Sequence, residues 1–584
     1  MIRYPYLQEQ PSSRVTTDVF RGLNLGSRIG EGEFEEMENL TSDHFPVLSP
    51  REKRSRCYNT SDPQGMYKVP GGAVFFVNGN SLNMYDGRQV YVIYEDMIET
   101  QIPRQFALMG NRLVIAPDMK WLDILHPFEG LKDMGAWLKK TEGEVTFSLC
   151  QRDGTAFPTV TAQEEPPENP GNQALWLDTS GSTSELKQYS TSSGEWVGIS
   201  TYVKISGLTD HPFQTGDGIT LSGVDPHAPQ AVSALNGSYV VETAGSDFLV
   251  ITGLIPESYT QNCADAPLEI RREVPQLDFI VEAGNRLWGC QHNVNEIYAS
   301  KLGDFTNWNV FSGISTDSWV GNVGSPGVFT GAVNHGGYPV FYKENMKHKV
   351  WPSSTGAHQI TSTPCMGIAE GSSESAALCG EKLFYLSPQG ICMDDGSGPV
   401  SIDEALGHLR YQSGAGAVHR SKYYLSAHNE DGKWDLLVYD LSKGLWHRED
   451  DLQLMHLVSA DRNLYGLGNG HLWDLTGKNG TKEETVHWSA VTGDLCQSGG
   501  DRQYISRVNL RLSLEEGSRL DIYARYDHNP LWVKLGTVYG TGPDSFSLPV
   551  RPRRCDHLQL KLEGVGGGKV YAITRSFEKG SAYR

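Results

Sequence analysis

The strongest constraint on the fold is a recurring unit: an apolar strand, a short turn with Gly or Asn, and a second apolar strand. Two copies, "FALMGNRLVIAPD" and "FIVEAGNRLWGCQ", share Gly-Asn-Arg-Leu at 110–113 and 284–287. The segments that fit the unit are 72–87, 104–118, 277–291, 328–345, 375–390, 414–440 and 456–475. From Gly284 onward their turns fall about 40–50 residues apart, the spacing of four-stranded blades. We therefore predict an all-β fold built on a β-propeller of about seven blades.

A set of unrelated hairpins in two sandwiches is the alternative, and the even spacing favours the propeller. Radial packing also protects the strand edges, since each blade covers its neighbours. The shared tetrapeptide is then a hairpin turn in two successive blades. We interpret Arg112 and Arg286 as solvated turn residues rather than ligands.

The repeat is interrupted once, and the sequence changes character again near its end. After the Pro- and Glu-rich linker "TAQEEPPENPGN" come a small β-module, "LWLDTSGSTSELKQYSTSSGEWV", and an alternating stretch typical of a β-sandwich or small barrel. The last hundred residues alternate strictly, which predicts a C-terminal β-sandwich. The expected parts are an extended N-terminal arm (1–60), the first propeller part (61–142), inserted β-modules (143–275), the second propeller part (276–481) and the sandwich (482–584).

Charge and cysteine content narrow the function classes. The net charge of −20 gives no basic surface with which to grip nucleic acid, although nucleic acid could slide past such a protein. Nine scattered cysteines without a CxxC pair indicate reduced thiols. The start lacks the apolar core of a signal peptide, and no apolar run is long enough for a membrane segment.

The motif search predicts no catalytic, cofactor or metal site, because no Walker loop, Gly-x-Ser-x-Gly elbow or His-Glu-x-x-His helix occurs. The acidic "EGEFEE" (31–36) indicates a solvated arm rather than a cation site. Trp176 and Trp196 are either core anchors or residues that stack on a glycan. Arg551, Arg553 and Arg554 are either a solvated strand edge or an inter-subunit contact.

The N-terminal segment carries a family resemblance. It contains Arg-Gly-Leu-Asn (21–24), an acidic Gly-Glu-Gly-Glu stretch (30–33), Glu-Asn-Leu (38–40) and Pro-Val-Leu-Ser-Pro-Arg (46–51). This layout resembles the opening of β-propeller structural proteins in tailed-phage virions and prophages, including the nozzle or stabilisation proteins that end a short tail. The module "LWLDTSGSTSELKQYSTSSGEWV" and the word "RPRRCDHLQLKLEGVG" are also similar to segments of phage tail proteins.

The resemblance implies a non-enzymatic virion protein of the tail, assembled in the host cytoplasm. It implies a ring of six copies, as a nozzle, hub or connector, around the tail channel through which DNA passes without specific binding. This ring would contact other tail or portal/adaptor proteins. The assembly residues it suggests are Arg21, Asn24, Glu33, Arg551, Arg553 and Arg554. The alternatives are a receptor- or glycan-binding tail protein, with residues 143–275 as its binding part, and a propeller glycoside hydrolase.

The arm itself gives one further expectation. Being polar and rich in Gly and Pro, residues 1–50 should become ordered only against another surface, with their acids meeting basic residues of a neighbouring copy. Their removal is expected to abolish ring formation while leaving the propeller folded.

Overall fold

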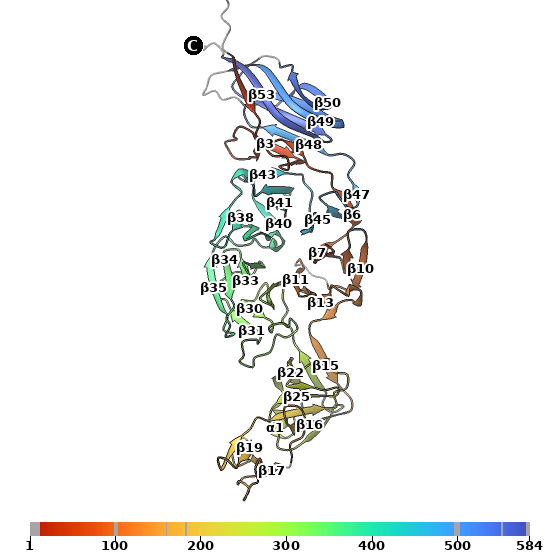
Figure 1. The fold of residues 1–584 in the computed structure, drawn as a ribbon, viewed down its shortest axis with the longest axis vertical. Coiled ribbons are helices and arrows are strands. Elements are labelled where there is room, and N and C mark those ends of the chain that lie inside the picture. Colours follow the sequence, from red (N-terminus) through yellow and green to blue (C-terminus); the bar gives the residue numbers. More distant parts are fainter. Residues whose placement is uncertain are drawn as a thin grey trace, which may run out of the picture.

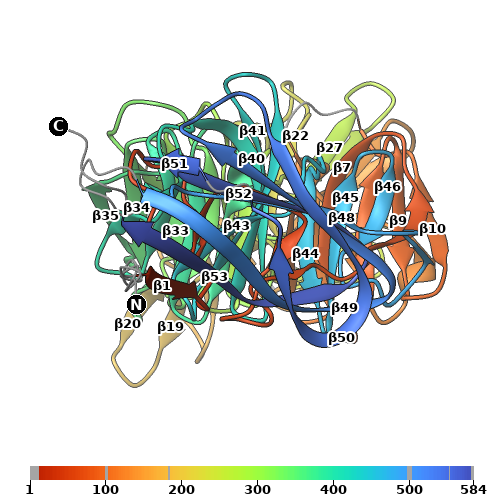
Figure 2. The same ribbon diagram turned by 90° about the horizontal axis from the view of Figure 1, so that it is seen from above.

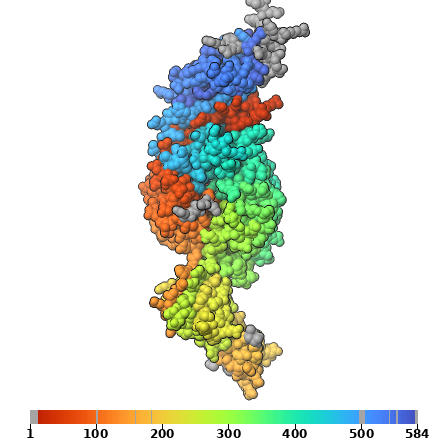
Figure 3. Space-filling view, turned by 180° about the vertical axis from the view of Figure 1, so that it is seen from behind, coloured from red at the N-terminus to blue at the C-terminus, as the bar shows by residue number. Residues whose placement is uncertain are grey.

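The computed structural model describes residues 12–98, 103–158, 160–181, 184–495, 503–550 and 553–579. Strands make up 53% of the chain and helices 2%, which confirms the all-β prediction. The molecule is elongated, with three parts stacked along its long axis (Figure 1). The inserted part lies at one end, a group of small sheets in the middle, and the C-terminal strands at the other end. A narrow waist separates the inserted part from the middle (Figure 3).

Within the described residues the middle part contains seven groups of antiparallel strands: five are separate four-stranded sheets, one is a four-strand group that continues into the large C-terminal sheet, and one is a sheet of five strands. The first four are β7 (Pro63–Lys68), β8 (Val74–Asn78), β9 (Ser81–Tyr85) and β10 (Val90–Glu95); β11 (Gln105–Met109), β12 (Arg112–Ala116), β13 (Lys120–Asp123) and β14 (Lys132–Asp133); β28 (Phe279–Ala283), β29 (Arg286–Cys290), β30 (Glu296–Ala299) and β31 (Trp319–Asn322); and β32 (Gly331–His335), β33 (Tyr338–Lys343), β34 (Met346–Trp351) and β35 (Gln359–Pro364).

The other three are β36 (Ala377–Cys379), β37 (Lys382–Ser387), β38 (Gly390–Asp394) and β39 (Pro399–Ser401); β40 (Tyr411–His419), β41 (Lys422–Asn429), β42 (Trp434–Asp440) and β43 (Leu445–Arg448); and β44 (His456–Ala460), β45 (Asn463–Gly468), β46 (His471–Asp474) and β6 (Ser55–Asn59). The short strand β47 (Thr481–Lys482) pairs with the far edge of β6. Single 3-10 turns interrupt the connections at η1 (Pro127–Glu129), η2 (Ser373–Ser375) and η3 (Glu404–Leu406).

Buried apolar clusters join each of these sheets to the next, and β44 of the last sheet contacts β7 of the first. Pairs that share a cluster across successive boundaries are Phe75 with Leu113, Ala107 with Leu287, Trp288 with Phe341, Tyr342 with Tyr385, Phe384 with Tyr423, Leu436 with Leu464, and Phe76 with Leu467. The seven sheets thus close on themselves, and we call them the sheet ring. The propeller of about seven blades stays our interpretation of this ring.

The repeated tetrapeptide does form a hairpin turn in two consecutive sheets, between β11 and β12 and between β28 and β29. Gly110 (φ 61°), Gly284 (φ 62°) and Asn285 (φ 59°) occupy the left-handed region that such turns require. The interpretation of Arg286 as solvated is wrong. Its side chain is 3% exposed, and its guanidinium donates to the carbonyls of Ser300, Ser315 and Asp317.

The inserted part consists of three small sheets and one helical turn. Two sheets share one apolar core: β15 (Ala136–Lys140), β22 (Gly218–Ser222), β23 (Gly237–Val240) and β27 (Leu268–Arg272), and β16 (Glu144–Cys150), β21 (Tyr202–Ser206), β24 (Thr243–Ala244), β25 (Phe248–Thr252) and β26 (Tyr259–Asn262). Helix α1 (Gln230–Ser233) lies in this core unit. The third sheet is the distal module, β17 (Val160–Gln163), β18 (Leu175–Asp178), β19 (Glu185–Ser190) and β20 (Glu195–Gly198). The first strand, β15, begins before the boundary of 143 that the sequence predicted.

At the opposite end, the C-terminal strands form one sheet that folds over its own core. Its members are β48 (His487–Thr492), β49 (Gln503–Tyr526), β50 (Val533–Leu548), β51 (Arg553–Cys555), β52 (Leu558–Val565) and β53 (Gly568–Lys579). The first half of β49 pairs with β53 and its second half with β52, so one strand serves both layers. Figure 2 shows β49 and β50 crossing above the sheet ring.

The N-terminal segment is not an extended arm ending at residue 60. Its strands are β1 (Ser12–Thr17), β2 (Gly22–Leu23), β3 (Glu33–Glu38), β4 (Leu40–Thr41) and β5 (Ser49–Pro50). Strand β1 pairs with β53, β3 with β48 and β2 with β43, and β6 completes the last sheet of the ring. Because its apolar side chains lie in the core cluster of the C-terminal sheet, deleting residues 1–50 would expose that core and not leave the rest intact.

Reduced cysteines are confirmed for seven positions: Cys57, Cys150, Cys263, Cys290, Cys365, Cys379 and Cys392 are free thiols. Cys496 lies outside the described residues. Burial raises the pKa of both Cys150 and Cys392 to about 11, which keeps them protonated at neutral pH. We expect iodoacetamide to label these two slowly in the native protein and fully after denaturation, read by peptide mass spectrometry. Peptides that stay protected after denaturation without a reductant would contradict this.

The inserted part should be removable. Strands β15 and β27 pair antiparallel, with Ala136 opposite Arg272, so both ends of the insertion leave the sheet ring side by side. Its apolar core is separate from those of the ring. Deleting residues 136–272 and joining the ends with a short Gly/Ser loop is expected to leave a folded, soluble ring, measured by circular dichroism and cooperative urea unfolding. An insoluble remainder would show that the insertion completes the ring.

A single substitution controls for the contacts that this deletion removes. The amide of Asn307, in the ring, donates to the Asp217 carboxylate of the insertion at 3.0 Å, and Lys301 donates to the Gly216 carbonyl at 2.9 Å. Asn307→Ala in the full chain should reproduce the part of any stability loss that comes from the Asn307 bond.

Candidate functional site

The N-terminal residues suggested for assembly lie in one closed loop. Asn24 donates from its side-chain amide to the Glu33 carboxylate at 2.6 Å, and its backbone amide donates to the Phe34 carbonyl at 2.9 Å. The exposed Arg21 enters this loop through a backbone bond to Gly32. Asn24 and Glu33 therefore fix the loop of their own chain, and Arg21 is the member whose side chain faces solvent.

The sequence had indicated that the neighbouring acids are solvated. Glu36 is exposed, but Glu31 and Glu35 are only partly exposed and meet cations of the same chain. Glu31 pairs with Arg575, whose guanidinium is fully buried, at 3.1 Å. Glu35 accepts from the Gln559 side chain and lies 3.9 Å from Arg525. The expectation that these acids reach basic residues of a neighbouring copy is corrected for Glu31 and Glu35. They hold the N-terminal strands to the C-terminal sheet.

A second cluster of ion pairs joins the N-terminal segment to the sheet ring. The Arg54 side chain is 1% exposed and donates to Glu449 and Asp450, at 2.6 Å in each case. Arg51 adds bonds to Glu483 at 2.8 Å and to Asp450 at 3.6 Å. These carboxylates hold the pKa of Arg54 above its usual value against the effect of burial, and Arg54 in turn lowers the pKa of Asp450. Nothing in the sequence pattern singled out Arg54, since its partners are distant in the chain.

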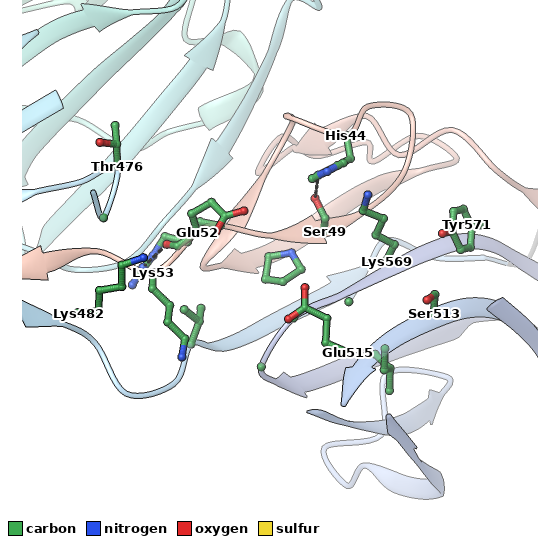
Figure 4. Close-up of a pocket in the computed structure, with 18 residues that line it drawn as sticks. His44, Ser49, Glu52, Lys53, Thr476, Lys482, Ser513, Glu515, Lys569 and Tyr571 are labelled. Atoms are coloured by element: carbon green, nitrogen blue, oxygen red, sulfur yellow. Dashed lines mark hydrogen bonds between the residues drawn. The ribbon is translucent and has the colours of Figure 1, made fainter. Parts of the chain in front are cut away.

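A cavity of about 430 Å³ lies where the N-terminal segment, the last sheet of the ring and the C-terminal sheet meet (Figure 4). Its charged lining residues are Arg51, Glu52, Lys53, Lys482, Glu515 and Lys569. Cations outnumber carboxylates here, although the whole chain carries a net charge of −20. The junction cavity is thus an electropositive recess suited to an anionic group.

His44 and Ser49 also line the junction cavity, joined by a hydrogen bond of 3.1 Å (Figure 4). A Ser–His pair is the beginning of a nucleophile–base arrangement. Ser49, however, is 2% exposed and sits in β5, which pairs with β4. Within the described part of the chain, no carboxylate bonds the other ring nitrogen of His44, so the pair lacks an orienting group.

A smaller cavity of about 230 Å³ lies among β7, β40 and β44, where Asp62, Glu374 and His456 line it. Glu374 accepts from the Gln105 amide at 2.7 Å and lies 3.4 Å from His456, while Asp62 accepts from Gln64 at 2.7 Å. Two carboxylates in one recess are the minimum that a glycosidase needs. Here each already has a partner in the protein.

The tryptophans considered for glycan stacking belong to the distal module. Trp176 is 6% exposed, its indole donates to the Gln163 carbonyl at 2.9 Å, and Lys187 lies over its ring. Trp196 is half-buried, with its ring centroid 5.4 Å from that of Trp176 and 5.3 Å from that of Tyr189. The two indole rings are in contact. Trp176 is a core residue of the module, and Trp196 is the more accessible of the two.

The basic segment near the C-terminus, with Arg551, Arg553 and Arg554, lies only partly within the described residues. Arg551 lies outside the described residues, as does the side chain of Arg553. Arg554 is exposed in β51, which pairs with the beginning of β49. An inter-subunit role for these arginines stays a prediction.

Comparisons with known proteins give no family. No protein-family model matches the chain, and no curated protein matches it. Solved structures that it resembles include the exo-beta-1,3-galactanase from Phanerochaete chrysosporium, with 12% identity over 51% of this chain and 94% of that one and a TM-score of 0.20. The PorZ component of the type-IX secretion system of Porphyromonas gingivalis is 11% identical over 88% and 71% of the two chains, with a TM-score of 0.23.

The phage phi92 endosialidase is 9% identical over 72% of this chain and 66% of that one, with a TM-score of 0.23. The structural neighbours thus include a phage protein, a secretion-system component and an enzyme of carbohydrate chemistry. Scores this low assign no activity and no number of blades. Among the described residues, no helix has the length and apolar character needed to cross a bilayer.

Proposed function

We propose that this protein is a non-enzymatic structural component of a phage tail that assembles with copies of itself into a ring around the channel for DNA. One observation carries the proposal. The N-terminal segment, which bears the resemblance to tail proteins, is the element that couples the C-terminal sheet to the sheet ring. Its ion pairs, Glu31–Arg575 and Arg54–Glu449–Asp450, have a buried arginine at each junction. A rigid, elongated subunit of this kind suits a load-bearing ring.

The surface of the sheet ring supports a role in assembly. Leu125 and Phe128 are 67% and 68% exposed, and Phe128 contacts Tyr91 beside the exposed Val92. Phe311 and Ile314 form a second apolar group, 59% and 60% exposed. Apolar groups gathered on an outer surface are typical of contacts between proteins. We propose that the group around Phe128 packs against a neighbouring copy.

The charge of the protein is compatible with the passage of DNA. A channel wall with net negative charge repels phosphates, whereas a basic wall would release counterions and retain the strand. The net charge of −20 therefore supports passage without specific binding.

Light scattering behind a sizing column tests the proposal, with the full chain measured over a range of concentrations and the largest species imaged in negative stain. We expect a closed ring with a central channel and a mass several times that of one chain. Leu125→Ser with Phe128→Ser should shift the distribution towards the single chain. Val400→Ser, at an apolar position that is 50% exposed on another sheet, is the control. A single chain at every concentration, or particles without a channel, would overturn the proposal.

Glycan binding is the second candidate, favoured by the position of the distal module at the end of the molecule farthest from the C-terminal sheet (Figure 1). Trp196 and Tyr189 would supply the stacking surface. Binding of the full chain to a glycan array should disappear in Trp196→Ala and persist in Trp137→Ala, which alters an exposed tryptophan outside the module. Equal binding by both variants would exclude the module as the site.

A further inference from the structure

Two histidines and an aspartate converge at one end of the C-terminal sheet, although the sequence predicted no metal site. Asp494 follows β48, His528 lies between β49 and β50, and His557 lies between β51 and β52. Their potential ligand atoms all lie within 4.8 Å of one another. We propose that Asp494, His528 and His557 bind a divalent transition-metal ion of the zinc type.

The separations fit a shared ion. Asp494 Oδ2 lies 3.4 Å from His528 Nε2 and 3.3 Å from His557 Nδ1. Two donor atoms that each lie about 2.1 Å from a tetrahedral zinc ion are about 3.4 Å apart. A direct N–H···O bond would instead bring the heavy atoms to about 2.9 Å. Both separations from Asp494 are thus those expected between ligands of one ion, and the two histidine nitrogens lie within 4.8 Å of each other.

The loops that present the ligands are tied to each other. The Asp527 carboxylate accepts from the backbone amides of Asp556 and His557, at 2.7 and 3.0 Å. The backbone amide of Asp527 donates to the His557 carbonyl at 2.8 Å, and that of Leu495 donates to the Leu558 carbonyl at 2.8 Å. These bonds hold the backbone of the three loops together without the ion, so only the ligand side chains would lose freedom on binding.

His528 stands at an unusual backbone position. Asp527 (φ 50°) and His528 (φ 51°) are both in the left-handed region, in a turn closed by the bond from the Asn529 amide to the Tyr526 carbonyl. The second of these positions normally favours glycine, since a side chain there costs energy. At this position the imidazole of His528 lies close to the other two ligands, although it is also partly exposed to solvent.

The ligand set decides the class of ion. Imidazole suits Zn²⁺, Cu²⁺ and Ni²⁺, whereas Mg²⁺ and Ca²⁺ prefer oxygen donors. Asp556 Oδ2 lies 3.4 Å from His557 Nε2, which places a carboxylate at the ring nitrogen that does not bind the ion. Three protein ligands at a partly exposed site leave one tetrahedral position open.

Titration calorimetry on the metal-free full chain tests the site, with ZnCl₂ as the probe and MgCl₂ as the comparison ion. We expect one Zn²⁺ per chain and no Mg²⁺. Both His528→Asn and His557→Gln should weaken zinc binding at least about tenfold. Asparagine tolerates the left-handed backbone, so the first variant is expected to fold normally. His126→Gln is the matched control, because His126 faces Asp123 at 3.4 Å outside any three-ligand group.

A second readout separates binding from folding. Zinc should raise the urea midpoint of the unaltered chain, since a ligand of the native state stabilises it, and should leave both ligand variants unchanged. The absence of saturable one-to-one zinc binding would overturn the proposal. Binding that either ligand variant retains at full strength would do the same.

Discussion

Replacing Arg54 by methionine is expected to lower the free energy of unfolding by about 3–5 kcal/mol, the usual effect of removing one partner from a buried ion pair. Arg54 is almost fully buried between Glu449 and Asp450. Without its guanidinium, two carboxylates would face each other in a site with little water. The loss should be visible as a lower urea midpoint, followed by tryptophan fluorescence.

Two further variants make the result specific. Arg112→Met removes the ion pair with Asp123, whose arginine side chain is 35% exposed, and should change stability by less than about 1 kcal/mol. Adding Glu449→Gln and Asp450→Asn to Arg54→Met should restore part of the loss, because the unpaired charges disappear. Equal losses from Arg54→Met and Arg112→Met would contradict the role given to the buried group.

The second large effect is a loss of stability in mild acid. Burial lowers the pKa of His348 and His419 to about 4 and that of His447 to about 3. In the unfolded chain each would titrate near 6.5. Between these values the unfolded state binds protons that the native state does not, so stability falls as the pH drops from about 6.5 towards 4. His348 and His419 each contribute about 3 kcal/mol when the window is fully crossed, and His447 contributes about 5 kcal/mol.

The groups around these histidines explain why their pKa values are low. His348 is bonded to the Ser325 and Ser362 hydroxyls at 2.9 and 2.8 Å, and Lys343 adds repulsion. His447 lies among Lys422, Asp43 and Asp440, with neither ring nitrogen bonded within the described part of the chain. Below pH 4 the carboxylates of Asp43, Asp440 and Asp450, whose pKa values are lowered, become protonated and add to the loss.

Urea unfolding measured at steps between pH 7 and pH 4 tests this prediction. The midpoint should fall steeply below about pH 6, and His447→Leu should flatten the curve, since it removes one of the groups that takes up a proton on unfolding. His126→Gln, at an exposed histidine, should leave the curve unchanged. A midpoint that stays constant down to pH 4.5 would show that these rings are protonated in the native state.

Local chemistry determined much of the fold. The turn residues at Gly110–Asn111 and Gly284–Asn285, with apolar strands on either side, specify hairpins whatever surrounds them, because the left-handed backbone is a local requirement. The interruption of the repeat, the small β-modules and the all-β class follow from the same strand-and-turn pattern. Reduced cysteines followed from their number and spacing.

Long-range pairing decided the remainder. Nothing local to β6 says that it completes a sheet begun at residue 456, or that β1 pairs with β53, since strand partners depend on the closure of the whole chain. For the same reason the acids of "EGEFEE" looked solvated, and Arg286 looked like an exposed turn residue. The sequence also could not predict that Asp494, His528 and His557 come together, because loops distant in the sequence meet only after β48, β49 and β52 have paired. The sequence determined which segments are strands and turns; tertiary structure alone decided which charges and ligands face each other, because that depends on contacts between segments far apart in the chain.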